Sequence, residues 1–320
     1  MLLEAATFIV GFVVLIKGAD FLVKGGSSLG KRFGMSDLVI GLTIVSFGTS
    51  MPELLVNVIS SLQGSSELAI GNVLGSNIAN ILLILGVSAL VCPLPITRNT
   101  YFIEIPFSLT ATLLVGFLAN ASLFYHVTDL YISRFDGVVL LFFFFLFLGY
   151  IFMTTKEKKE AAFKTTYKEE SLFKSIGLTT LGILGLYFGG DWIVDGALYF
   201  AGYFDVSESF IGLTVVALGT SLPELVTSAV AAFKKNTDIA VGNVVGSNIF
   251  NMLWILGASA VIKPLPFDVI SNTDILMIIA SSSMLIMAVV IGKRPVISRP
   301  EAIFFLIFYF AYIYYLVDRG

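Results

Sequence analysis

Two glutamates stand inside long apolar stretches of the sequence: Glu53 in IGLTIVSFGTSMPELLVNVI and Glu224 in IGLTVVALGTSLPELVTSAV. A carboxylate in such surroundings is costly unless it is paired or used, so function is its default interpretation. No Lys or Arg occurs within either stretch, or within the apolar stretch that follows it. We therefore expect both glutamates to be functional.

The residues before each glutamate predict an interrupted helix with polar groups on one face. Pro52 has no backbone N–H, so the carbonyl of Gly48 loses its helical partner, and backbone oxygens around 46–49 are expected to be free to coordinate. Polar side chains lie at intervals of three and four residues, which places them on one stripe of a helix. These stripes are Ser46, Ser50, Glu53 and Asn57 in one stretch, and Ala217, Ser221, Glu224 and Ser228 in the other.

A second pair of stripes follows in the next apolar segments. Asn72, Ser76 and Asn80 share one helix face, as do Asn243, Ser247 and Asn251. A lone Ser or Asn in a membrane helix often serves only as a hydrogen bond between helices, and for Asn72 and Asn243 this alternative stays open.

Together these groups form a set of oxygen ligands without a soft donor, which disfavours zinc and copper. Such a set suits calcium, which takes 6–8 oxygen ligands, better than magnesium, which holds its waters tightly. Sodium is also a hard cation and can use the same oxygens.

The composition places these stripes in a membrane. Of the 320 residues, 57% are hydrophobic and 13% are charged, with a mean hydropathy of +0.94. A soluble domain has roughly 45–50% apolar and about 25% charged residues, so a cytosolic enzyme, a nucleic-acid binder and a disordered protein are excluded. Segments of about 20 apolar residues predict ten membrane helices. These are residues 5–29, 36–62, 68–92, 101–124, 135–153, 175–200, 208–233, 239–262, 274–292 and 300–317.

The two halves of the chain are copies of each other. Residues 36–95 align without gaps on residues 207–266, and thirty of the sixty positions are identical. Each copy also ends in Pro-Leu-Pro, at Pro93 and Pro264. The halves therefore arose by duplication.

The period contains five predicted spans, and an odd number forces the second copy to enter the membrane from the other side. Lys31 and Arg32 follow the first span, but the equivalent loop of the second half has no basic residue. Conversely, Lys234 and Lys235 follow the seventh span, and the loop after the second span has none. This exchange agrees with the positive-inside rule. Both termini are then extracellular.

We predict an all-α polytopic membrane protein with ten transmembrane helices in two inverted five-helix repeats. The first repeat occupies residues 1–153, a cytoplasmic linker loop residues 154–174, and the second repeat residues 175–320. Inverted repeats are typical of secondary transporters, whose sites lie near the membrane midplane between interrupted helices.

The doubled motif GTSxPE followed by GNxxGSNxxN resembles the α-repeats of the cation/calcium exchanger superfamily. Within it, the chain looks like a prokaryotic sodium/calcium exchanger. The resemblance covers essentially the whole chain. It implies a sodium/calcium antiporter of the cell membrane, electrogenic with three Na⁺ per Ca²⁺, whose first and sixth spans slide across the core.

The resemblance also implies roles for individual residues. Glu53 and Glu224 would be central ligands for both ions. The other implied ligands are Thr49 and Thr220, with the carbonyls of Ser46 and Ala217; Ser50, Ser76, Ser221 and Ser247, which would serve flanking sodium sites; and Asn80 and Asn251, which would face the centre. Some relatives carry Asp at the position of Asn251, so this site has two carboxylates rather than three.

Three alternatives use the same residues differently. A proton/calcium exchanger of the same fold commonly places His near the central amides, and this chain has none there. An intramembrane hydrolase needs a nucleophile–base pair or an aspartyl dyad. A passive channel would need no gated inverted halves. The sequence predicts no cofactor other than the transported ions, no catalytic residue, no nucleic-acid partner and no obligate protein partner.

Overall fold

The computed structural model of the chain describes residues 2–121, 130–157, 170–203, 217–291 and 295–319, and it is built almost wholly of helices. The first half contains α1 (Leu2–Arg32), α2 (Asp37–Ile40), η1 (Gly41–Val45), α3 (Ser46–Thr49), α4 (Met51–Gln63), α5 (Ser66–Ala79), η2 (Asn80–Ile84), α6 (Leu85–Val91), η3 (Thr100–Glu104), α7 (Ile105–Ala119) and α8 (Arg134–Glu157). The second half contains α9 (Leu172–Tyr203), α11 (Ala217–Thr220), α12 (Leu222–Phe233), α13 (Thr237–Ile249), η7 (Phe250–Ile255), α14 (Leu256–Ile262), α15 (Ser271–Ile291) and α16 (Arg299–Arg319). The η segments are π-helical.

The helices support a membrane protein with many spans. Eight are long and apolar enough to cross a bilayer, and the bent pair Asp37–Thr49 and Met51–Gln63 makes a ninth within the described residues. The predicted span 208–233 falls partly outside them, because 208–216 are not described, so the number ten is not tested. The membrane character is confirmed.

The ends of several spans differ from the sequence prediction. The first helix, predicted over 5–29, extends over Leu2–Arg32, because polar residues such as Glu4 and Lys31 continue the helix beyond its apolar part. The predicted loop 154–174 is shorter at both ends, since α8 continues to Glu157 and α9 begins at Leu172. Residues 158–169 of this loop lie outside the described residues.

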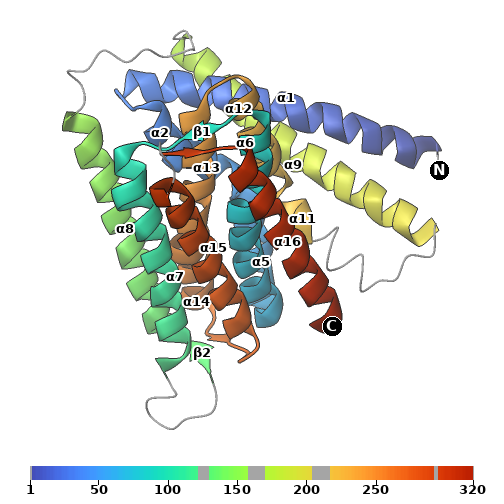
Figure 1. Cartoon of the computed structure of the whole chain (residues 1–320). Coiled ribbons are helices and arrows are strands. Elements are labelled where there is room, and N and C mark those ends of the chain that lie inside the picture. The colour runs from blue at the N-terminus through green and yellow to red at the C-terminus, as the bar shows by residue number, and fades with distance from the viewer. Residues whose placement is uncertain (1, 122–129, 158–169, 204–216, 292–294, 320) are drawn as a thin grey trace.

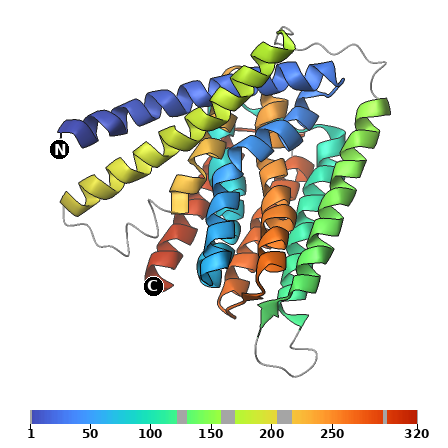
Figure 2. The same ribbon diagram turned by 180° about the vertical axis from the view of Figure 1, so that it is seen from behind.

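The long helices α1 and α9 lie side by side and cross the bundle formed by the other helices obliquely (Figures 1 and 2). Glycines line their contact, so that the two backbones approach closely. A Cβ atom at Gly18 would lie 2.7 Å from the backbone nitrogen of Leu186, and one at Gly189 would lie 2.6 Å from that of Leu15. Small side chains therefore determine how closely these helices pack.

We expect Gly189→Ala to lower the stability of the protein. The added methyl group overlaps backbone atoms, which cannot move as the end of a flexible side chain could, and such overpacking typically costs about 1–3 kcal/mol. The measurement is the midpoint of thermal unfolding in detergent. Gly177→Ala on the same helix is the matched control, because no described atom lies within 4 Å of its added Cβ. Equal midpoints for the two variants would contradict the close packing.

Two short antiparallel strand pairs join the halves of the chain. β1 (Leu94–Pro95) pairs with β4 (Val296–Ile297), and β2 (Tyr131–Ile132) pairs with β3 (Leu265–Pro266). β1 and β3 are the two Pro-Leu-Pro segments of the repeat. Each copy of the motif thus contacts the other half, which fixes the ends of the central helices relative to one another.

Candidate ion-binding site

Each glutamate follows a break in its helix. Ser50 separates α3 from α4 with backbone angles of φ −84° and ψ 9°, and the two parts of the span are bent by 48°. Ser221 separates α11 from α12 in the same way, with φ −88° and ψ 1°. A proline follows two residues after each serine, at Pro52 and Pro223. The predicted interruption is confirmed, and its cause is the missing N–H of these prolines.

Glu53 and Glu224 both lie in the first turn after the break, and each is 1% exposed. The N-terminal end of a helix favours a negative charge, because its backbone N–H groups have no partners within the helix. Neither oxygen of the Glu53 carboxyl group has a hydrogen-bond partner among the described residues, and neither does Oε2 of Glu224. Ser50 Oγ donates to Glu224 Oε1 at 2.8 Å. The carboxyl groups therefore keep free oxygens in a buried place.

The threonines before the breaks reach the polar stripe of the other half. Thr49 Oγ1 donates to Asn243 Oδ1 at 3.1 Å, and Thr220 Oγ1 donates to Asn72 Oδ1 at 3.1 Å. In the first bond the donor belongs to the first half of the chain, and in the second bond the donor belongs to the second half. For Asn72 and Asn243 the structure therefore shows hydrogen bonds between helices, which is the alternative that the sequence left open.

The serines repeat this exchange one residue further on. Ser50 Oγ bonds Ser247 Oγ at 3.0 Å, and Ser221 Oγ bonds Ser76 Oγ at 3.1 Å. Ser247 Oγ also lies 3.4 Å from Glu224 Oε1. These four bonds between the halves join eight residues, and two of the eight, Ser50 and Ser247, contact the carboxyl group of Glu224.

The side-chain amides of Asn80 and Asn251 each bond an asparagine of the other half that the stripes do not include. Asn80 Nδ2 donates to Asn248 Oδ1 at 2.9 Å, and Asn251 Nδ2 donates to Asn77 Oδ1 at 3.1 Å. Asn77 and Asn248 directly follow Ser76 and Ser247, so they lie beside the predicted stripe of each helix and are not members of it. Their presence in both copies of the GSN sequence is the signal that could have identified them.

The carbonyl of Ser46 differs from the expectation. It accepts hydrogen bonds from the backbone N–H of Ser50 at 2.9 Å and from Thr49 Oγ1 at 3.2 Å. The proline argument predicts a free carbonyl here, and this prediction is wrong for Ser46. The reason is that the helix stays intact through residue 49, and Pro52 removes only the bond to the carbonyl of Gly48. Ala217 begins α11 at the equivalent place, and only its backbone is described.

Close backbone packing holds the two stripes together. A Cβ at Gly246 of α13 would lie 2.7 Å from Ser46 Oγ, and one at Gly242 would lie 2.6 Å from the carbonyl oxygen of Leu38. The glycines therefore allow α13 to lie against η1 and α3 closely enough for the bonds between Thr49, Ser50 and α13.

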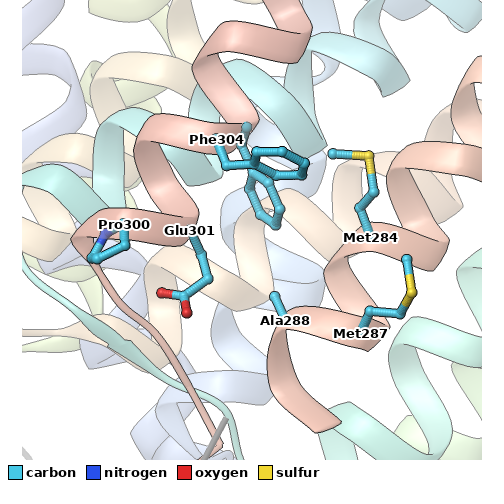
Figure 3. Close-up of a pocket in the computed structure, with 7 residues that line it drawn as sticks. Met284, Met287, Ala288, Pro300, Glu301 and Phe304 are labelled. Atoms are coloured by element: carbon cyan, nitrogen blue, oxygen red, sulfur yellow. The ribbon is translucent and has the colours of Figure 1, made fainter. Parts of the chain in front are cut away.

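The apolar pocket between α15 and α16 is separate from this site. It has a volume of about 440 Å³ and is lined by Met284, Met287, Ala288, Pro300, Glu301, Phe304 and Phe305 (Figure 3). Glu301 accepts the backbone N–H of Ser298 at 3.0 Å, which is a bond at the start of α16. None of the predicted site residues lines it.

Within the described ranges, no group of three or more His, Cys, Asp or Glu side chains is placed so that it could hold a metal ion. Besides its two carboxylates, the central site therefore offers hydroxyl and amide oxygens.

The fold and the site define a class: a polytopic membrane protein with a buried, oxygen-lined site between two broken helices. The family model described as "Sodium/calcium exchanger protein" matches residues 3–153 and 174–317. The chain therefore belongs to the sodium/calcium exchanger family. This agrees with the expected transporter and with the family suggested by the repeated motifs.

Individual relatives match over nearly the whole chain. The putative antiporter CaxA of Alkalimonas amylolytica is 36% identical over 99% of both chains. The sodium/calcium exchanger MaX1 of Methanosarcina acetivorans is 32% identical over 95% of this chain and 96% of its own. The solved structure of the sodium–calcium exchanger NCX_Mj soaked with zero Na⁺ and Ca²⁺ is 33% identical, with a TM-score of 0.79 over 98% of this chain and 99% of that chain.

Proposed function

We propose that the protein is a secondary active antiporter that exchanges sodium for calcium across the cell membrane by alternating access. The observation that carries the proposal is the buried pair Glu53 and Glu224, whose free oxygens lie in a site of hydroxyl and amide groups. Buried carboxylates require a counter-charge. Hard cations with oxygen ligands supply it, and calcium is the divalent ion that such a set favours.

The proposed ligand roles are those that the resemblance of the repeated motifs implies. Glu53 and Glu224 bind both calcium and sodium, one ion species at a time. Their neighbours on the two stripes supply the remaining oxygens. These are Thr49, Thr220, Ser50, Ser221, Ser76, Ser247, Asn80 and Asn251, with the backbone carbonyls of Ser46 and Ala217. A carbonyl oxygen has two lone pairs, so Ser46 can accept a hydrogen bond and still coordinate an ion.

Movement of α1 and α9 would open the site alternately to the two sides of the membrane. The glycines between these helices support movement as a pair, because their close backbone contact joins α1 to α9 while both slide across the core. The two halves are inverted relative to each other, with extracellular termini and a cytoplasmic loop over 154–174. This inversion gives two equivalent states, one with the site open to the outside and one with it open to the cytoplasm.

The test of the function is uptake of radiolabelled calcium into proteoliposomes that contain the purified protein. We expect an outward sodium gradient to drive uptake and an outward proton gradient of the same size to drive little, because the central amides have no His beside them. Liposomes without protein, and proteoliposomes with sodium equal on both sides, are the controls. Uptake driven by protons alone would replace sodium coupling with proton/calcium exchange of the same fold.

A further inference from the structure

We propose that Asn77 and Asn248 are positioning residues, which turn the side-chain oxygens of Asn251 and Asn80 toward the transported cation. The proposal rests on the proposed function, since it concerns how that same site binds its ion. Asn77 and Asn248 are not themselves ligands here. Each holds the amide of the ligand that belongs to the other half of the chain.

The contacts are paired between the halves. Asn80 gives its Nδ2 to Asn248, and Asn251, which occupies the place equivalent to Asn80, gives its Nδ2 to Asn77. Asn77 Nδ2 in addition lies 3.4 Å from the backbone oxygen of Asn248. All four side chains are at most 3% exposed. Water therefore does not compete for these bonds.

A bond at one end of a carboxamide fixes the direction of the other end. The amide group has a donor nitrogen and an acceptor oxygen, and rotation by half a turn would exchange them. With the nitrogen held, the oxygen must point the opposite way. Oδ1 of Asn80 and Oδ1 of Asn251 are both buried without a hydrogen-bond partner among the described residues. A buried acceptor without a partner is costly, so a bound cation is the partner that explains the arrangement.

The segments that carry these oxygens pack against the helices that carry the carboxylates. η2, which begins at Asn80, packs against α12, the helix that carries Glu224. η7, which contains Asn251, packs against α4, the helix that carries Glu53. Single π-helical turns are rare and are often found at functional sites. Here they occur at the same place in both halves, at the residues whose oxygens are held.

A double-mutant cycle on calcium binding tests the proposal. Leu has the branched shape and the same number of side-chain heavy atoms as Asn but cannot accept a hydrogen bond, so Asn248→Leu releases the amide of Asn80. We expect the calcium dissociation constant, measured from the calcium-dependent rise in the unfolding midpoint of the purified full chain, to increase about tenfold, which corresponds to about 1.4 kcal/mol. In the Asn80→Ala background, Asn248→Leu should change it less than about twofold, because the residue through which it acts is gone.

The matched control combines Asn80→Ala with a change in the other pair, Asn77 and Asn251. Asn77→Leu acts through Asn251, so in the Asn80→Ala background it should keep its full, roughly tenfold effect. If Asn248→Leu leaves calcium binding unchanged, or weakens it equally with and without Asn80, the positioning role is wrong. Should Asn248→Leu fail to fold, as shown by its midpoint without calcium, the mirror cycle of Asn77→Leu with Asn251→Ala gives the same decision.

The design separates this inference from the function itself. If the unmutated protein shows no calcium-dependent rise in its midpoint and no sodium-driven uptake, the proposed function fails and the positioning role fails with it. The unmutated protein could instead bind and transport calcium while Asn248→Leu and Asn80→Ala have additive effects on the calcium dissociation constant. In that case only the positioning role is overturned.

Discussion

Glu53→Gln and Glu224→Gln are each expected to reduce sodium-driven calcium uptake at least about 100-fold, which corresponds to about 2.7 kcal/mol. Each carboxylate is buried, and no basic side chain is available in its helix to replace the cation. Gln keeps the size and one acceptor oxygen of Glu but removes one negative charge. A site with one carboxylate no longer balances a divalent ion, and calcium binding should suffer most.

Stability distinguishes a lost ligand from a damaged fold. Two carboxylates in one buried site repel each other when no cation is bound. Each Gln variant should therefore unfold in calcium- and sodium-free buffer at a temperature no lower than the unmutated protein. It should also lose the rise in midpoint that calcium causes. Uptake near the normal rate in either variant would remove that glutamate from the site.

The chemistry-bearing part of the site could be predicted because it depends on local geometry. A proline interrupts its own helix, and residues three or four apart share a helix face, whatever the rest of the fold does. Duplication then placed both stripes in each half. The contacts of Ser50 with Ser247 and of Ser221 with Ser76 join members of these stripes.

The contacts of Asn77 and Asn248 could not be derived in the same way. The expected stripes run at intervals of four residues, and they pass over the asparagine that directly follows Ser76 and Ser247. η2 and η7 are π-helical, and this change of period is not visible in the residue types. The pairing also runs between residues 168 and 174 positions apart, which no local rule connects.

The ion pairs of Asp20 also show that local rules predict contacts within a helix but not contacts between distant helices. Asp20 of α1 forms an ion pair with Lys24 on its own helix at 3.1 Å, a spacing of four residues that sequence reasoning can recognise. It also pairs with Lys234 at the end of α12. That second pair depends on how α1 crosses the bundle, and helix crossing is set by the packing of side chains over the whole contact. The ends of two helices also differ from the prediction, since polar residues extend α1 and α8 beyond their apolar parts.

The charge of the site predicts how exchange responds to voltage. With both glutamates ionised, the site carries about −2, so one Ca²⁺ makes it neutral and two Na⁺ would do the same. Two pairs of bonded serines, Ser76 with Ser221 and Ser50 with Ser247, are the flanking sodium ligands that we propose. We propose three Na⁺ per Ca²⁺. The sodium-loaded site then carries about +1 and the calcium-loaded site about 0.

A loaded site of about +1 must feel the membrane potential as it crosses, at up to ~2.3 kcal/mol per charge per 100 mV. Calcium uptake driven by sodium leaving the vesicle moves one net positive charge outward, so an interior-positive potential should accelerate it and an interior-negative potential should slow it. The measurement is uptake into proteoliposomes clamped with potassium and valinomycin at positive, zero and negative interior potential, with the sodium gradient held constant. Glu53→Gln proteoliposomes at the same potentials are the control for leakage, since calcium that enters without exchange would also respond to voltage. Because a neutral two-for-one exchange moves no net charge, equal rates at all three potentials would exclude the third sodium ion while leaving the two carboxylates as the site of antiport.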